Sequence, residues 1–299
     1  MIRGLVTGCN LKFLPGAVGL LRSVENFHPD VVRFCMVPPD DLDAVRSQMG
    51  KLAEVIPPPR KMRGVPDTPL LQLLAARAFI STFSVDVVAW VDSDVVFCRP
   101  APELWQVPPG QVNAVKDFYN LGLMVPRDIW NAYARQFNGL KPDNDGFNAG
   151  IYALRNEDWF DLGEKYEAVI APGNFPYYPP GFDQAVLNGL FHGRVNWLSR
   201  QFNALSVYEH GLPDDVRIIH FTANPKPWMP GYGRHNPGYL EWAQYGEQAS
   251  SIRAGWLRMY YSVNAPRRLG YRAARKILTL LGLWRHEIGV SNGPPTPGP

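Results

Sequence analysis

The chain has 299 residues, of which 46% are hydrophobic and 19% are charged, so it is long enough for one large α/β domain or two small ones. No apolar run approaches the roughly 20 residues that a membrane-spanning helix needs. Met1 leads directly into an apolar strand, so we expect no signal peptide. The three cysteines lack the spacing of a metal site and indicate reduced thiols in a cytoplasmic protein.

The formal net charge of +3 is distributed unevenly along the chain. Residues 253–286 hold eight basic side chains and no acidic one. Of the 30 basic residues in the chain, 22 therefore remain against 27 acidic ones, which leaves a net charge of −5 elsewhere. The basic character belongs to the C-terminal segment and not to the core.

Strands and helices alternate along the first hundred residues. The apolar pattern predicts strands at residues 2–7, 31–37, 53–56 and 85–91, with helices at residues 15–27, 40–49 and 70–83 between them. This order favours a mostly parallel, doubly wound sheet. Ligands of such sheets bind beyond the carboxyl ends of the strands, where Thr7-Gly8-Cys9-Asn10 and Asp92-Ser93-Asp94 lie.

The second half of the chain is less regular. We predict strands at residues 147–154 and 216–220, and helices at residues 158–169, 182–191 and 238–261. Residues 289–299 are rich in Gly, Pro and Ser, which is typical of a disordered tail.

Two carboxylates, Asp92 and Asp94, follow a strand that is almost wholly apolar. Carboxylates so close together repel each other and lose hydration unless a cation lies between them. The pair is therefore typical of oxygen ligands for Mg²⁺ or Mn²⁺, an ion that commonly bridges to a phosphate. A surface loop with a helix cap and a salt bridge fits this segment equally well.

Three further segments carry polar groups at the ends of predicted elements. His220 ends an apolar strand, and Lys226 follows six residues later. His220 could be a metal ligand and Lys226 could neutralise a diphosphate. Alternatively, the histidine is satisfied by the backbone and the lysine is solvated. Asp183 and Gln184 begin a helix, where an N-cap is the simpler reading. Asn148 lies among small residues, where a ligand could approach the backbone or the chain could turn tightly.

These segments together resemble the GT-A glycosyltransferases of the family 8 type, which include glycogenins and bacterial lipopolysaccharide galactosyl- and glucosyltransferases. The resemblance covers residues 1–232. Its motifs occur in the family's order: Val91-Asp92-Ser93-Asp94, Phe147-Asn148-Ala149-Gly150, Phe182-Asp183-Gln184, and the stretch from His220 to Trp228. It implies an α/β GT-A fold with a Rossmann-like, doubly wound mixed sheet.

The resemblance also implies roles for individual residues. The metal, Mn²⁺ or Mg²⁺, would be held by Asp92, Asp94 and His220. The donor would be contacted by six residues: Thr7, Gly8, Asn10, Arg77, Asn148 and Lys226. Gln184 would face the anomeric carbon of the donor sugar, with Asp183 beside it. There are three departures from the family pattern: Ala223 in place of Gly, Ala185 in place of an acid, and no acid near Cys9 and Asn10. The first affects a backbone contact to phosphate, and together they bear on the donor base more than on metal binding.

We therefore expect a metal-dependent transferase that moves a sugar from a nucleotide-diphosphate sugar, a UDP-sugar, to a saccharide or glycolipid acceptor with retention of configuration. An amide such as Gln184 is a poor nucleophile, which favours attack by the acceptor on the face that the leaving group departs from; Asp183 as a transient nucleophile stays open. An inactive nucleotide-sugar-binding protein and a sugar nucleotidyltransferase are the alternatives. We expect no nucleic-acid partner.

Aromatic side chains flank the predicted site and suit either the rings of an acceptor sugar or simple core packing: Tyr177, Tyr178, Trp228, Tyr232 and Trp242.

The predicted domains are a catalytic domain at residues 1–262, a basic amphipathic helical extension at residues 263–288, and a disordered tail at residues 289–299. The helix can start at Pro266 and run to about Trp284, with apolar residues along one stripe and basic residues mostly off it. Such a helix suits the surface of an anionic membrane or a docking site on the catalytic domain. The charge asymmetry favours the membrane, so we expect a cytoplasmic protein held peripherally on the inner face of the membrane.

Overall fold

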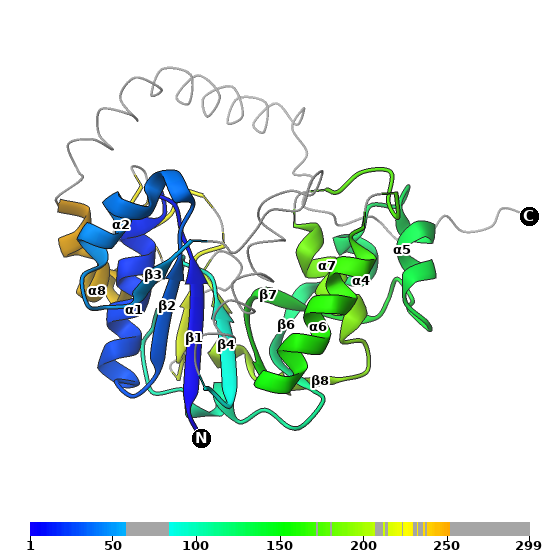
Figure 1. Ribbon diagram of the computed structural model, residues 1–299, viewed down its shortest axis with the longest axis horizontal. Helices are drawn as coiled ribbons and strands as arrows, with labels where there is room; N and C mark the ends of the chain where they lie inside the picture. The colour runs from blue at the N-terminus through cyan, green and yellow to red at the C-terminus, as the bar shows by residue number, and fades with distance from the viewer. Residues whose placement is uncertain are drawn as a thin grey trace, which may run out of the picture. The chain divides into compact units, whose positions relative to one another are not determined.

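The computed structural model describes residues 1–57, 84–171, 173–179, 181–206, 215–222, 224–229 and 238–251, together with residues 212, 232 and 236. Its first elements alternate as the sequence predicts (Figure 1). They are β1 (Arg3–Gly8), α1 (Leu14–Phe27), β2 (Val32–Met36), α2 (Leu42–Met49), β3 (Glu54–Ile56) and β4 (Val87–Val91). The helix predicted at residues 70–83, with Arg77 on it, lies outside the described residues.

After β4, the described residues contain the predicted elements, the last of them in part, and several more. The predicted ones are β7 (Asp145–Arg155), α6 (Asn156–Val169), α7 (Phe182–Leu190), β10 (Ile218–His220) and α8 (Tyr239–Ser251). The additional ones are β5 (Val95–Phe97), β6 (Val112–Asn120), α4 (Leu121–Met124), α5 (Trp130–Gln136), β8 (Val195–Leu198) and β9 (Ala204–Leu205). The part of the helix predicted beyond residue 251 lies outside the described residues, as do the domain boundaries predicted at residues 262 and 288.

The large sheet has seven strands in the order β3-β2-β1-β4-β7-β6-β8. Strands β3, β2, β1 and β4 run parallel, whereas β7 is antiparallel to both of its neighbours, β4 and β6. The sheet is therefore mixed. Because β7 runs opposite to β4, the middle of β7 lies beside the end of β4: Val91 stands opposite Ile151, and the backbone N–H of Asp92 donates to the carbonyl of Gly150 at 2.8 Å.

A second, three-stranded sheet has the order β5-β10-β9. The acidic turn Asp92-Ser93-Asp94 connects the two sheets, since β4 belongs to the large sheet and β5 to the small one. Strand β10 pairs antiparallel with β5, and His220 stands opposite Val95. This register places His220 directly beside the acidic turn, although more than a hundred residues separate them in the chain.

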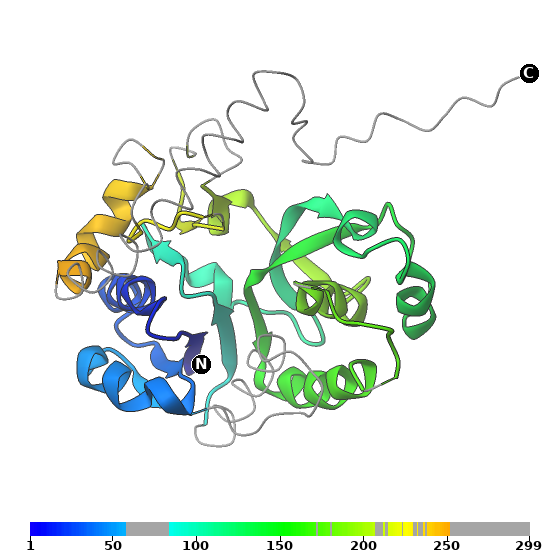
Figure 2. The same cartoon turned by 90° about the horizontal axis from the view of Figure 1, so that it is seen from above.

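Period-two alternation along the central strands divides the core between the two faces of the large sheet. Val6, Val88 and Trp90 pack with residues of α6 and α7. Leu5, Ala89 and Val91 pack with residues of α1 and α2. Figure 2 shows the same division: the blue α1 and α2, with the orange α8, gather on one side, and the green α6 and α7 on the other.

Among the described residues, none of the helices has both the length and the apolar character needed to cross a membrane.

Candidate active site

A cavity of about 940 Å³ opens beyond the carboxyl ends of β1 and β4. Nine of the predicted site residues line it: Gly8, Asn10, Asp92, Asp94, Asn148, Asp183, Gln184, His220 and Lys226. They come from both halves of the chain, from the ends of strands and from the start of α7. The fold therefore brings together the motifs that the sequence analysis singled out separately.

One predicted site residue of the described part of the chain, Thr7, is not at this cavity. Thr7 is fully buried and is not among the described residues that line the cavity. Its neighbours Gly8 and Asn10 do line it. The Asn10 side-chain oxygen accepts from the backbone N–H of Lys12 and of Phe13, at 3.0 and 3.2 Å, and so fixes the turn that leads into α1. Arg77 lies outside the described residues.

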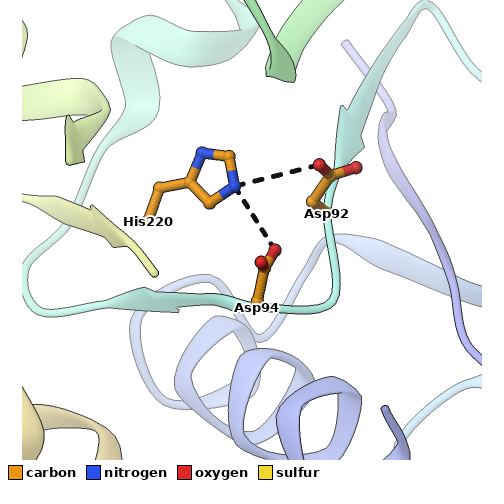
Figure 3. Close-up of side chains that lie close together, drawn as sticks. All are labelled: Asp92, Asp94 and His220. Carbon is orange, nitrogen blue, oxygen red and sulfur yellow. Dashed lines mark ion pairs between the residues drawn. The ribbon is translucent and has the colours of Figure 1, made fainter. Parts of the chain in front are cut away.

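Asp92, Asp94 and His220 form a compact cluster at the end of β4 (Figure 3). His220 Nε2 lies 3.8 Å from Asp92 Oδ2 and 3.3 Å from Asp94 Oδ1. One ligand atom from each of the three residues falls within 4.8 Å of the others. Gly150 is part of this geometry, because a Cβ atom there would lie 2.1 Å from Cε1 of the His220 ring. The histidine can occupy its position only beside a glycine.

The two carboxylates of the cluster have opposite electrostatic surroundings. Burial and the neighbouring Asp94 charge raise the pKa of Asp92 to about 7. The pKa of Asp94 is lowered, because His220 and Lys226 together outweigh the effect of its burial. Asp94 is thus the anchored anion, and Asp92 is the carboxylate that gains most from an added positive charge.

The donor set of the cluster fits a divalent cation. Two carboxylates and one imidazole are the mixture of oxygen and nitrogen ligands that suits Mn²⁺, and Mg²⁺ accepts the carboxylates. A cation between Asp92 and Asp94 would also remove the repulsion that raises the pKa of Asp92.

Lys226 is buried and reaches the same cluster. Its Nζ donates to Asp94 Oδ2 at 2.5 Å and to the carbonyl oxygen of Phe221. The lysine therefore holds one oxygen of Asp94 while the other faces His220. Its predicted contact with a donor diphosphate stays a prediction, and its position on the cavity wall is compatible with that role.

The other side of the cavity is a hydrogen-bonded group around Gln184. The Gln184 Oε1 accepts from the backbone N–H of Ala149 at 3.0 Å, and its Nε2 donates to Asp117 Oδ2 at 3.1 Å. Asn148 Nδ2 donates to the same Asp117 oxygen at 3.0 Å. Both ends of the Gln184 amide are thereby held, and its orientation is fixed. Asp183, beside it, is buried on the cavity wall.

Sequence reasoning missed two buried residues in this region, Asp117 and Asn203. Asp117 lies within β6, where Asn113 and Lys116 interrupt the apolar residues, so the signal that marks Asp92 after β4 is weak there. Asn203 donates to Asn148 Oδ1 at 3.1 Å and faces His220 Nδ1 at 3.2 Å. No local pattern marks Asn203, because it lies in a short connection before β9.

The aromatic residues that flank the predicted site serve different purposes. Tyr178 lines the cavity. Trp228 and Trp242 are buried and pack against each other with ring centroids 6.0 Å apart, so core packing accounts for them. Tyr177 is exposed and donates to the carboxylate of Asp128. Tyr232 packs against Phe221 at 6.0 Å.

A mixed α/β sheet with an Asp-Asp-His cluster at a strand end and a polar cavity beside it is the arrangement of the GT-A glycosyltransferases. A family model agrees: residues 5–230 match the model described as glycosyl transferase family 8. This match spans most of the chain, and the protein belongs to that family.

Two curated relatives support the assignment at low identity. The Escherichia coli lipopolysaccharide 1,2-glucosyltransferase is 22% identical over 212 residues, which are 64% of this chain and 54% of that protein. An Arabidopsis thaliana protein described as "Probable galacturonosyltransferase-like 4" is 23% identical over 217 residues, which are 63% of this chain and 55% of that protein. The chain thus spans about half the length of the curated relatives it matches.

Solved structures share the fold. The bifunctional glycosyltransferase WbbM superposes with a TM-score of 0.55 and 17% identity over 81% of this chain and 49% of that one. The glycosyltransferase GlyE of Streptococcus pneumoniae gives a TM-score of 0.53 and 18% identity over 88% and 64% of the two chains. An active-site mutant of LgtC gives 0.50 and 18% identity over 81% and 95%. At these identities the likeness concerns the fold alone.

Proposed function

We propose that this protein is a metal-dependent hexosyltransferase that moves a sugar from a UDP-sugar to a saccharide or glycolipid acceptor with retention of configuration. One observation carries the proposal. The Asp92, Asp94 and His220 cluster opens onto the same cavity as the fixed amide of Gln184. A diphosphate bound at the cluster can therefore present its sugar to Gln184.

The cluster suits the side of the reaction where negative charge develops. Breaking the bond between the sugar and the phosphate leaves charge on the departing diphosphate. A bound Mn²⁺ or Mg²⁺ supplies Lewis-acid stabilisation of that charge. Lys226 adds a buried ammonium on the same wall, where a low local dielectric strengthens its attraction for phosphate oxygens.

Gln184 suits the side where positive charge develops on the sugar. Its Nε2 donates to Asp117, and its Oε1 accepts from Ala149, so the side chain cannot turn away from the cavity. An amide oxygen stabilises an oxocarbenium-like ring but is a poor nucleophile. This favours attack by the acceptor on the face from which the diphosphate leaves. Asp183 as a transient nucleophile is the second pathway that the geometry allows, because its carboxylate is buried on the same wall.

The relatives' names support the substrate class. One curated relative is named for glucosyl transfer to lipopolysaccharide and the other for galacturonosyl transfer. Tyr119, Tyr178 and Met124 on the cavity wall offer apolar faces to a sugar ring. A saccharide or a glycolipid acceptor fits these contacts.

The test is donor hydrolysis and transfer by the purified protein, with the variant Asp94→Asn. We expect the protein to release UDP from a UDP-sugar in the presence of Mn²⁺. Asp94→Asn removes the anchored anion of the cluster and should lower turnover by about 10²-fold or more. Asp161→Asn is the matched control, because Asp161 pairs with Lys165 on the exposed face of α6.

A thermal-shift panel of nucleotide sugars, each with and without Mn²⁺, identifies the donor. Full activity of Asp94→Asn in buffer treated with a chelator would contradict the proposal. UDP-sugar binding without any release of UDP would instead support an inactive nucleotide-sugar-binding protein.

A further inference from the structure

A continuous chain of side-chain hydrogen bonds joins the metal cluster to the sugar side of the cavity. It runs from His220 Nδ1 to Asn203 Oδ1 at 3.2 Å, and from Asn203 Nδ2 to Asn148 Oδ1 at 3.1 Å. From Asn148 Nδ2 it continues to Asp117 Oδ2 at 3.0 Å, where Gln184 also donates. His220, Asn203, Asn148 and Asp117 are all buried. Asn203 is the side chain that joins His220 to Asn148 in this chain of hydrogen bonds.

Two groups with a known hydrogen-bonding role, the Gly150 N–H and the Asp117 carboxylate, set the donor and acceptor at each step of this hydrogen-bond series. The backbone N–H of Gly150 can only donate, and it donates to Asn148 Oδ1 at 3.1 Å. Asp117 Oδ2 accepts from Asn148 Nδ2. The Asn148 amide therefore has one possible orientation, with its oxygen toward Asn203.

The orientation of Asn148 sets that of Asn203, and Asn203 sets the tautomer of His220. Asn203 must turn its NH₂ group toward the Asn148 oxygen, so its own oxygen faces His220. A carbonyl oxygen can only accept, so Nδ1 of His220 must carry the hydrogen. Nε2 is then the ring nitrogen that faces Asp92 and Asp94, and its lone pair is the one that a metal there would take.

We propose that Asn203 is a positioning residue that holds His220 in the Nδ1–H tautomer for metal binding and holds Asn148 in place for the donor sugar. This proposal rests on the proposed function for the identity of the two ligands. Asn203 touches neither of them, and it acts through the two residues that do. The hydrogen bond of Asn203 to Asn148 can be removed while the one to His220 is kept, so the two parts of the role can be tested separately.

The first experiment compares Asn203→Leu, which has a similar volume and no amide, with the unchanged protein. Manganese affinity is measured from the EPR signal of free Mn²⁺, with no substrate present. We expect Asn203→Leu to bind Mn²⁺ about 10–100-fold more weakly. The matched control is Asn196→Leu, which also loses a side-chain amide bond, to Asn113, at a position not among the described cavity residues. This control should leave Mn²⁺ affinity unchanged.

The tautomer is read directly by ¹⁵N NMR of protein labelled at its six histidines, without metal and at alkaline pH. The His220 signals are assigned by their loss in His220→Gln. We expect Nδ1–H in the unchanged protein and a shift toward Nε2–H in Asn203→Leu. A predominant Nε2–H form in the unchanged protein would overturn the proposal.

The second variant, Asn203→Asp, separates the two halves of the role. A carboxylate still accepts from Nδ1–H of His220, so Mn²⁺ affinity should stay at or above that of the unchanged protein. A carboxylate cannot donate to Asn148, so binding of UDP-glucose and UDP-galactose should weaken by about 5-fold or more relative to UDP, measured with saturating Mn²⁺.

Equal loss of Mn²⁺ affinity in Asn203→Asp and Asn203→Leu would overturn the proposal, as would Asn203→Leu binding Mn²⁺ as tightly as the unchanged protein. None of these readouts requires turnover. If they hold while the protein transfers no sugar, the proposed function fails and the role of Asn203 stands. If transfer occurs and the readouts fail, the role of Asn203 fails alone.

Discussion

Asp92 is the residue whose ionised form, which a metal ligand needs, is destabilised by its surroundings in the folded protein. Its carboxylate accepts from the Trp90 indole N–H at 2.8 Å, yet burial and the Asp94 charge raise its pKa to about 7. The unfolded chain has the ordinary value, 3.8. Between about pH 4 and pH 7 the folded protein therefore holds a proton that the unfolded chain does not. The stabilising contribution of that proton is complete below pH 4 and is lost as the pH rises through 7.

Asp92→Asn should therefore become more stable than the unchanged protein as the pH rises. The asparagine has no charge to desolvate and can still accept from Trp90. In buffer with a chelator, we expect similar melting temperatures near pH 4 and a higher melting temperature for the variant at pH 8. The side chain of Asp92 is 34% exposed, so the shift should be modest.

With Mn²⁺ at pH 8, the unchanged protein should instead have the higher melting temperature, because it binds the metal and Asp92→Asn has lost a metal ligand. A variant less stable than the unchanged protein at pH 8 without metal would contradict this account of Asp92. Thermal unfolding followed by circular dichroism provides the measurement.

At the scale of elements, helix α1 supports the strand that follows the acidic turn. Ser23 in α1 is fully buried, donates to the carbonyl of Leu20 at 2.6 Å and accepts from the backbone N–H of Phe97 at 3.0 Å. Phe97 belongs to β5, which pairs with the strand that carries His220. The hydroxyl of Ser23 thus connects α1 to β5 of the small sheet, and β5 in turn supports the strand that carries His220 of the Asp-Asp-His cluster.

Ser23→Ala should lower the free energy of unfolding by about 1–3 kcal/mol, because it leaves a buried backbone N–H without its acceptor. The control is Ser47→Ala in α2, whose hydroxyl makes the same kind of bond, to Ala44 at 2.9 Å, at an exposed position. That change should stay within about 0.5 kcal/mol. Urea unfolding of the two variants measures the difference, and equal effects would show that Ser23 contributes no more than a surface serine.

At the scale of the whole molecule, the uneven charge distribution raises the question of where the protein works. Residues 253–286 carry eight basic side chains and no acidic one, while the rest of the chain has a net charge of −5. This segment lies outside the described residues, so its predicted amphipathic helix stays a prediction. A glycolipid acceptor would make a membrane-bound position useful, and we propose that the protein acts at the cytoplasmic face of an anionic membrane.

Removal of residues 266–299 should reduce co-sedimentation with phosphatidylglycerol vesicles. Binding of the full chain should fall as salt rises, because each basic residue near an anionic surface contributes about 1 kcal/mol that ions screen. Phosphatidylcholine vesicles are the control and should bind neither protein. Equal binding of the truncated and full chains to phosphatidylglycerol would reject the membrane role and favour soluble acceptors.

The sequence predicted the parts of the fold that local patterns encode. Short apolar runs indicated β1, β2 and β4, and helical patterns indicated α1 and α7. Strand β6 and the edge strand β8 were not predicted, because polar residues such as Asn113 and Asn196 interrupt their apolar residues. The hydrogen bond from Asn196 to Asn113 forms only because β6 and β8 pair in the folded sheet, so neither strand's sequence indicates it.

The same distinction holds for the site. By itself the sequence determined which chemical groups end the central strands, namely Asp92, Asp94 and His220, because a charge after a buried strand is conspicuous in a local reading. Only the tertiary structure decided how Asn203 connects His220 to Asn148, and how Asp117 holds Asn148 and Gln184. Those contacts join residues far apart in the chain, such as Asn203 and Asn148, and depend on the antiparallel course of β7. The direction of a hydrogen bond between two amides follows from what surrounds them in space, and no run of neighbouring residues encodes it.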